Sequence, residues 1–256
     1  MKNLAIATAL LALAASGAAQ AADIPVKAPV LREVVPVFSW QGCHIGVSGG
    51  ATFGRSRHDG NPPGPIELTP YFNISGGMVG VGYGCTYVLS PGWAFGTDSD
   101  LSWTNKRGSS FDTGPGGNPT FNSQTNEHWF STTRLRVGPT WDRLWVYATG
   151  GLATASVEGV LTVPGLGTFV ETHMLWGATG GAGLEYALSD MWSFKVEYLY
   201  ARFQNKAYTF GDNPVLGPAG LNSWRSGLNV DDHVFRVGLN YRFGCIFFCG
   251  PVVARY

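Results

Sequence analysis

The sequence of 256 residues has little charge and few long apolar runs. Charged residues make up 13% of the chain, against about 25% in a typical soluble domain. The 17 basic and 17 acidic residues cancel, so there is no basic excess that would point to nucleic acid as a partner. After residue 21, no stretch reaches the about 18 apolar residues of a membrane-spanning helix, so no later transmembrane helix is expected.

The sequence also lacks the usual signatures of enzymes and metal sites. The five histidines show no metal-binding spacing. Residues 46–50 match the G-x-S-x-G pattern of serine hydrolases, which requires a strand, a sharp turn and a helix, but no helical pattern follows them. We therefore predict no enzyme, no cofactor and no metal site. We predict polar boundary positions near strand ends for four histidines: His44, His128, His173 and His233.

The N-terminus has the pattern of an export signal. Lys2 supplies the positive start, residues 4–15 the apolar segment, and residues 19–21 a small-residue cleavage site. We predict residues 1–21 as a signal peptide cleaved between Ala21 and Ala22. A membrane anchor helix is the alternative, but the run is short and alanine-rich. Residues 22–39 contain three prolines and no apolar period, which predicts a flexible periplasmic arm.

What the rest of the chain has in abundance is an alternation of apolar with polar or small residues. It is clearest at residues 233–243, where the apolar positions are Phe235, Val237, Leu239, Tyr241 and Phe243. A period of two indicates a strand with one apolar and one polar face. The pattern recurs about eight times in an exported chain with little charge, which is typical of a transmembrane β-barrel.

The lengths of the connections indicate the topology. Short turns are expected near Pro91, Asp142 and Asp190, and they alternate with long connections at residues 55–71, 104–127, 158–172 and 204–232. Short periplasmic turns and long external loops are the plan of outer-membrane barrels. We predict an all-β, eight-stranded antiparallel transmembrane β-barrel of up-and-down topology over residues 40–243, followed by a periplasmic tail at 244–256. Six aromatic residues are expected in its interfacial girdles: Trp40, Trp93, Trp103, Trp141, Trp192 and Phe243.

One strand has an undecided phase. In residues 144–157, apolar side chains occupy both faces at the start of the segment, so the alternation does not say which face points inward.

Nine charged residues fall on the expected inward faces. They are Asp98, Asp100, Arg134, Arg136, Glu185, Lys195, Glu197, Arg236 and Arg242. A lysine or arginine facing lipid at mid-membrane would cost about 2–4 kcal/mol, which places these residues in the lumen. An interior plug of ion pairs is favoured, because eight strands leave an interior just wide enough for side chains. The alternative is a narrow hydrophilic pore beside the glycines at 80, 82 and 84.

Four cysteines in an exported chain indicate disulfides with three possible connectivities. Cys43 and Cys85 share the outward phase near the periplasmic ends of the first two strands. Direct antiparallel partners lie within disulfide range, so we predict a Cys43–Cys85 bond. Free thiols, or a bond from Cys43 to Cys245, are the alternatives, and Cys249 could close a small loop with Cys245.

Five segments together carry a resemblance to a known group. They are AADIPVKAP (21–29), WQGCHIGVSGG (40–50), WDRLWVYATGGLA (141–153), GLEYALSDMWSFKVEYLY (183–200) and HVFRVGLNYRF (233–243). The chain resembles the alpha-proteobacterial outer-membrane immunogenic proteins, also called porin-family surface antigens, with an OmpA-like eight-stranded barrel. The resemblance implies a Gram-negative outer membrane and its lipid as the surroundings. It also implies a structural surface protein that supports envelope integrity and exposes antigenic loops. A small-solute porin with a narrow charged lumen is the alternative.

The last strand resembles the closing strand that the barrel-assembly machinery of Gram-negative bacteria reads. That resemblance rests on the five alternating residues Phe235 to Phe243. Most such barrels end at the terminal aromatic residue, whereas here residues 244–256 follow it. The composition of the loops names no ligand, and the sequence predicts no oligomeric state.

Overall fold

The structure is a computed structural model that describes residues 38–60, 66–90, 92–204, 206–209 and 225–244. Several predictions fall outside these residues: the cleavage site at Ala21 and Ala22, most of the arm, and the tail with Cys245 and Cys249. Among the described residues there is no helix long and apolar enough to cross a membrane.

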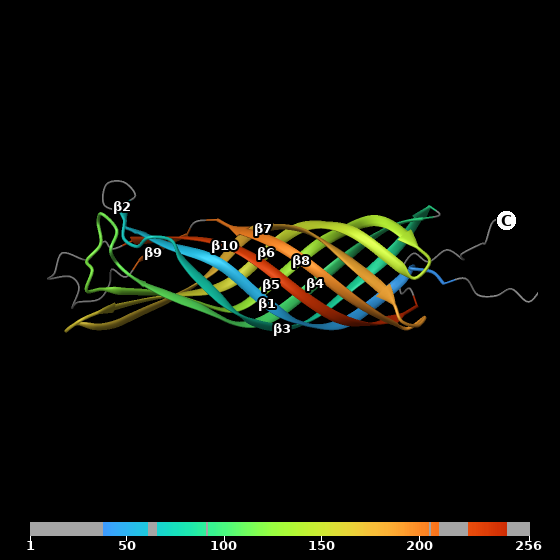
Figure 1. The fold of residues 1–256 in the computed structure, drawn as a ribbon, viewed down its shortest axis with the longest axis horizontal. Helices are drawn as coiled ribbons and strands as arrows, with labels where there is room; N and C mark the ends of the chain where they lie inside the picture. The colour runs from blue at the N-terminus through green and yellow to red at the C-terminus, as the bar shows by residue number, and fades with distance from the viewer. Residues whose placement is uncertain (1–37, 61–65, 91, 205, 210–224, 245–256) are drawn as a thin grey trace, which may run out of the picture. The chain divides into compact units, whose positions relative to one another are not determined.

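Ten strands form one antiparallel sheet that closes on itself. Their bounds are β1 (Gly42–Gly60), β2 (Ile66–Glu67), β3 (Phe72–Ser90), β4 (Trp93–Phe111), β5 (Asn122–Trp141), β6 (Leu144–Val163), β7 (Gly167–Ala187), β8 (Trp192–Phe203), β9 (Lys206–Thr209) and β10 (Arg225–Phe243). Each long strand pairs with the next, and β1 pairs with β10, which lies beside it in Figure 1. The short strands β2 and β9 extend the pairing of β1 and β10. The predicted eight-stranded, up-and-down barrel is confirmed.

The register of the strands determines their tilt. Paired residues lead around the ring from Cys43 on β1 back to Phe53 on the same strand, through Cys85, Thr97, Leu135, Gly150, Gly180, Tyr200 and His233. The ring therefore closes ten residues further along β1. For eight strands, a stagger of this size corresponds to a tilt of about 40°, with an interior only wide enough for side chains.

The outward face carries an apolar band of limited height. On β4, the exposed outward residues run from Trp93 through Leu101 to Trp103 and then change to Asn105 and Arg107. Ten steps of about 3.3 Å on a strand tilted by about 40° rise about 25 Å. This is the height of the lipid-facing band of outer-membrane barrels. The strands therefore project well beyond the band at the end where the long connections lie.

The predicted long loops are wrong in their extent. β4 continues to Phe111 and β5 begins at Asn122, so the connection expected at residues 104–127 shrinks to 112–121. Likewise, β6 and β7 leave only residues 164–166 of the loop expected at 158–172. At the remaining two connections, β1 extends to Gly60 and β10 begins at Arg225. Beyond the band the outward side chains face water, so the apolar face that marks a strand in the sequence disappears while the backbone pairing continues.

The aromatic residues at the band edges follow the prediction with two exceptions. Trp93, Trp103, Trp141 and Trp192 are all exposed. Trp40 is only 4% exposed, and its prediction as a girdle residue is wrong, because its ring turns into the mouth of the barrel. Phe243, at the end of β10, is half-buried.

At the end of the long connections, residues 112–121 pack on the segment that follows β2. The backbone N–H of Gly114 donates to the carbonyl oxygen of Leu68 at 2.8 Å, and that of Gly116 donates to Glu67 at 3.0 Å. A side chain at position 117 would come within 2.5 Å of the Leu68 oxygen, so Gly117 is required for this close approach. The two connections therefore form a packed cap on this end.

Asp112 begins the cap and makes its packing dependent on pH. Its side chain is fully buried, and this burial raises the pKa of Asp112 to about 6, with the nearby Ser123 opposing the shift in part. An exposed aspartate has a pKa of about 3.9. Between these two pKa values, Asp112 loses its proton in the opened cap but keeps it in the closed cap. The free energy that favours closure therefore falls as the pH rises through this window, and it is constant above it.

We expect Asp112→Asn to stabilise the cap above pH 6. At pH 7.5, the opening equilibrium of residues 112–121 should fall about tenfold to a hundredfold, and its change between pH 4 and 6 should disappear. Amide hydrogen exchange measures both effects. Asp190→Asn, at an exposed carboxylate in the turn after β7, is the control and should leave the cap unchanged. Opening of the unmodified cap that is equal at pH 4.5 and 7.5 would contradict the argument.

Candidate functional site: the filled lumen of the barrel

The structure places all nine predicted charged residues inside the barrel, each at most 8% exposed. β4 supplies Asp98 and Asp100, and β5 supplies Arg134 and Arg136. The other five come from β7, β8 and β10: Glu185, Lys195, Glu197, Arg236 and Arg242. Strand alternation explains the pairs two residues apart, because residues i and i+2 point to the same face.

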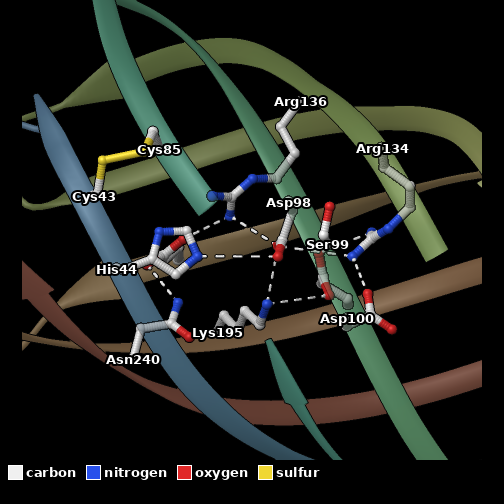
Figure 2. A network of polar contacts seen from close by, with 12 residues as sticks. Cys43, His44, Cys85, Asp98, Ser99, Asp100, Arg134, Arg136, Lys195 and Asn240 are labelled. Carbon is white, nitrogen blue, oxygen red and sulfur yellow. Dashed lines mark hydrogen bonds and ion pairs between the residues drawn. A yellow bond between two sulfur atoms is a disulfide. The ribbon is translucent and has the colours of Figure 1, made fainter. Parts of the chain in front are cut away.

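Asp98 is the shared partner of three cationic side chains of this group (Figure 2). Its Oδ2 is 3.0 Å from Lys195 Nζ, 3.4 Å from Arg136 Nη1 and 3.7 Å from Arg134 Nη2. Arg136 also reaches Glu185, at 3.0 Å from Oε2. One carboxylate therefore joins side chains from β5 and β8 across the interior.

Asp100 and Glu197 hold the next level. Asp100 Oδ2 accepts hydrogen bonds from Arg134 Nη2 at 3.0 Å and from Arg236 Nη2 at 2.9 Å. Glu197 accepts from Arg236 Nε at 2.8 Å and from Arg134 Nη1 at 3.3 Å. Each guanidinium is thus shared by two carboxylates. Four carboxylates and four cations balance, which is the condition under which buried charges are tolerated.

Arg242 lies at the edge of this network. Its guanidinium lies 4.7 Å from the ring centre of Trp40 and 4.9 Å from that of Phe38, and its Nη2 donates to the carbonyl oxygen of Ser39 at 3.0 Å. Within the described part of the chain, no ion pair joins Arg242 to a carboxylate. Arg242 therefore lies in the lumen as predicted, but not within ion-pair distance of the carboxylates of the network. It closes the short-turn mouth instead, together with Trp40, whose Nε1 donates to Asp142 O at 3.1 Å.

Sequence reasoning missed several residues of this site. Trp145 and Tyr147 on β6 point into the lumen. This decides which face of residues 144–157 points inward, which the sequence had left open. Arg136 lies over both rings, at 4.7 and 5.1 Å, and Tyr147 donates its hydroxyl to Glu197 Oε1 at 2.9 Å. His44 is buried 3.9 Å from Asp98, so it is a lumen residue and not the boundary residue predicted.

Beyond the charge network, the interior becomes apolar. The side chains that fill it belong to one cluster that includes Met78, Phe130, Ala155, Val157, Leu175, Leu199, Phe203 and Val234. Many inward residues here are apolar, although Ser56, His58 and Thr125 form a buried hydrogen-bonded group among them. Outward neighbours such as Glu158 and Arg107 are polar. One buried ionic group lies within this region, in which Lys106 Nζ contacts both Glu127 and Asp232. Sequence reasoning missed it because all three residues fell in predicted loops.

The glycine stripe on β3 leaves no gap. A side chain at Gly80 would meet Ser102 Oγ at 2.3 Å, and one at Gly84 would meet Thr97 O at 2.1 Å and His44 Cε1 at 2.8 Å. The space beside these glycines is therefore occupied by neighbouring strands and side chains. The glycines at 80 and 84 therefore give no support to a pore beside β3.

The remaining predicted residues are placed as follows. The structure contains the predicted Cys43–Cys85 disulfide, between direct partners of β1 and β3 with a Cα–Cα distance of 3.9 Å (Figure 2). Residues 46–50 lie inside β1, without the helix that a nucleophile elbow requires. In the described ranges, no group of His, Cys, Asp and Glu could hold a metal ion. The outward residues of the closing strand are exposed: Phe235, Val237, Leu239 and Tyr241.

Comparison with known proteins agrees with this fold. Residues 6–243 match the family model for the outer membrane protein beta-barrel domain. The 31 kDa outer-membrane immunogenic protein of Brucella melitensis is 32% identical over 262 residues, covering 95% of this chain and 100% of that protein. The 25 kDa outer-membrane immunogenic protein of the same organism is 28% identical over 95% of this chain and 99% of its own length.

Two further similarities are weaker. The 22 kDa outer membrane protein of Rhizobium leguminosarum is 28% identical over 77% of this chain and 80% of its own length. Among solved structures, the outer membrane protein OprG from Pseudomonas aeruginosa aligns with a TM-score of 0.46 and 15% identity, covering 80% of this chain and 97% of that one. From the family match and the 31 kDa relative, the chain belongs to the outer membrane protein beta-barrel domain family and is an outer-membrane protein of a Gram-negative bacterium.

Proposed function

We propose that this barrel is a structural surface protein of the outer membrane, with a closed lumen, that supports envelope integrity and exposes antigenic loops. The observation that carries the proposal is the filling of the lumen at three successive levels. Trp40, Trp145 and Arg242 occupy the short-turn mouth, the balanced charge network occupies the middle, and the apolar cluster occupies the projecting end. A porin needs a water-filled path through all three levels.

The surface role is supported by what projects beyond the apolar band. The strands continue beyond the band with mostly polar outward residues, and the cap at residues 112–121 covers this end of the barrel. The Brucella relatives are named outer-membrane immunogenic proteins. We assign surface exposure to the projecting end of this chain, with outer-membrane lipid around the band and the barrel-assembly machinery as the partner of the closing strand.

A small-solute porin is the second candidate, because eight charged side chains line one continuous region of the lumen. Single-channel recording in a planar bilayer separates the two functions. The refolded barrel, verified by heat-modifiable gel mobility, should show no discrete openings. Reproducible openings whose ion selectivity changes in Arg134→Ala would reject the closed lumen. Ser99→Ala, at an outward side chain on β4, is the matched control for the effect of substitution itself.

The structural role is tested in cells. Deletion of the protein should raise sensitivity to detergent and to large antibiotics that an intact outer membrane excludes. Re-expression of the unmodified chain should restore resistance. Normal resistance in the deletion strain would contradict the structural role, whatever the conductance result.

A further inference from the structure

A pocket of about 780 Å³ opens on the outside of the barrel where β7 and β8 stop pairing. The last paired residues toward the projecting end are Gly177 and Phe203. The pocket has an apolar part, formed by Leu152, Trp176 and Ala178, all of which are outward and exposed. These residues continue the lipid-facing band, so the part of the pocket that they line lies among the acyl chains of the membrane.

The part of the pocket beyond the band is polar and charged. Arg202 and Asp231 line it, each at the first outward charged position beyond the band on β8 and β10. Arg202 has a side chain that is 77% exposed, and its Nε lies 3.9 Å from Asp231 Oδ1. At this separation the carboxylate orients the guanidinium while leaving most of its five donors available.

A second guanidinium lies in the same row. Asp231 pairs with Arg202 on one side and with Arg55 of β1 on the other. All three side chains point outward and are exposed, and strands separated by about 4.8 Å place the two arginine Cα atoms about 10 Å apart. Two long cationic side chains with one carboxylate between them carry a net charge of +1, and both can reach one anion in front of the row.

The rim on the other side of the barrel also carries an outward arginine, Arg107 of β4, which is paired in register with Asn126 of β5. On β5 and β6 the outward side chains beyond the band include Asn126 and Glu158, which are hydrogen-bonded to each other at 2.8 Å. The cationic row and the apolar pocket therefore meet on one side, at β7, β8, β10 and β1.

We propose that this site binds one lipid of the outer leaflet whose phosphate headgroup carries a net negative charge. Arg202 and Arg55 hold the phosphate, and one acyl chain lies in the pocket along Leu152, Trp176 and Ala178. The pairing of a cationic row with an apolar cavity at the edge of the band selects an amphiphile over a free anion. Arginine suits the phosphate because its planar fork donates two parallel hydrogen bonds. The proposal is independent of whether the lumen conducts.

Trp176 provides the reporter for the test. The barrel is reconstituted in dioleoylphosphatidylcholine vesicles that contain brominated-chain phosphatidylglycerol or brominated-chain phosphatidylcholine. Subtracting the fluorescence of Trp176→Phe isolates the quenching of Trp176. Because a net charge of +1 near a membrane surface contributes about 1 kcal/mol toward anionic lipid, we expect phosphatidylglycerol to quench at about a fivefold lower mole fraction. The double variant Arg202→Gln/Arg55→Gln should quench equally with both lipids.

Three controls separate the contributions. Arg143→Gln removes an arginine that also pairs with an aspartate, Asp190 at 3.1 Å, but lies in the β5–β6 turn, so the preference should persist. Arg202→Lys keeps the charge and should retain part of the preference. Ala178→Phe fills the pocket and should weaken quenching by both lipids, with heat-modifiable mobility verifying the fold.

Two outcomes would overturn the proposal. Equal quenching of Trp176 by the two lipids in the unmodified barrel would remove the headgroup preference. Loss of the preference on adding inorganic phosphate, with no effect of Ala178→Phe, would assign the row to free phosphate and not to a lipid.

Discussion

Asp98→Ala is expected to lower the free energy of unfolding of the barrel by about 3–5 kcal/mol. Asp98 is fully buried, and its carboxylate is the shared partner of Lys195, Arg136 and Arg134. Its removal leaves the network with one excess positive charge in an interior closed on both sides. The cost of a buried charge without its partner exceeds what the ion pair itself contributes.

Urea unfolding of the barrel in lipid vesicles, followed by tryptophan fluorescence, measures the loss. Ser99→Ala is the matched control: it changes the next residue on β4, but that side chain points outward and donates to Thr133 Oγ1 at 3.2 Å. Its effect should stay within about 0.5 kcal/mol. The double variant Asp98→Ala/Lys195→Met removes the excess charge and should recover part of the loss. A loss below about 1 kcal/mol for Asp98→Ala would show that the network is not the charge-balanced unit described above.

Gly50→Val is expected to prevent closure of the barrel. Gly50 faces inward on β1 at the seam with β10, and a side chain there would come within 2.1 Å of Phe235 O and 2.8 Å of Arg236 Cα. These are backbone atoms of the closing strand, so no side-chain movement relieves the clash. The same glycine leaves space for the Arg236 side chain to cross the lumen to Asp100 and Glu197.

Heat-modifiable gel mobility after refolding measures closure, and Gly50→Val should give only the unfolded band. Gly49→Val is the control on the same strand. Gly49 faces outward, and the nearest atom to an added side chain is Met78 O at 3.8 Å. This variant should fold. If both variants fold with the same unfolding midpoint, the close approach of β1 and β10 is not essential.

The sequence by itself determined the number of strands, their order and most of the inward face. Within the band, lipid lies on one side and the charge network on the other, so each strand must alternate with a period of two. This contrast is local and can be read without knowing the neighbours. It placed the nine charged residues inside, including Asp98 and Glu197, because a charge on the lipid side is too costly.

Only the tertiary structure decided where the strands end. Beyond the band, the contrast reverses: Val157 and Leu161 are buried inside, while outward Glu158 faces water. A polar outward face has the same composition as a loop, so the sequence predicted loops at residues 104–127 and 158–172 where paired strands continue. The packed cap with Asp112 and the Lys106 group lie in this part of the chain.

Tertiary structure also decided which side chains meet across the ring. The ten-residue stagger brings Asp98 of β4 to Lys195 of β8, and Arg236 of β10 to Asp100 of β4. No spacing along the chain encodes these partners, because they depend on how the closed ring is sheared. The same holds for Trp40, which alternation alone placed in the girdle: its burial depends on Trp145 and Arg242, which come from opposite parts of the chain.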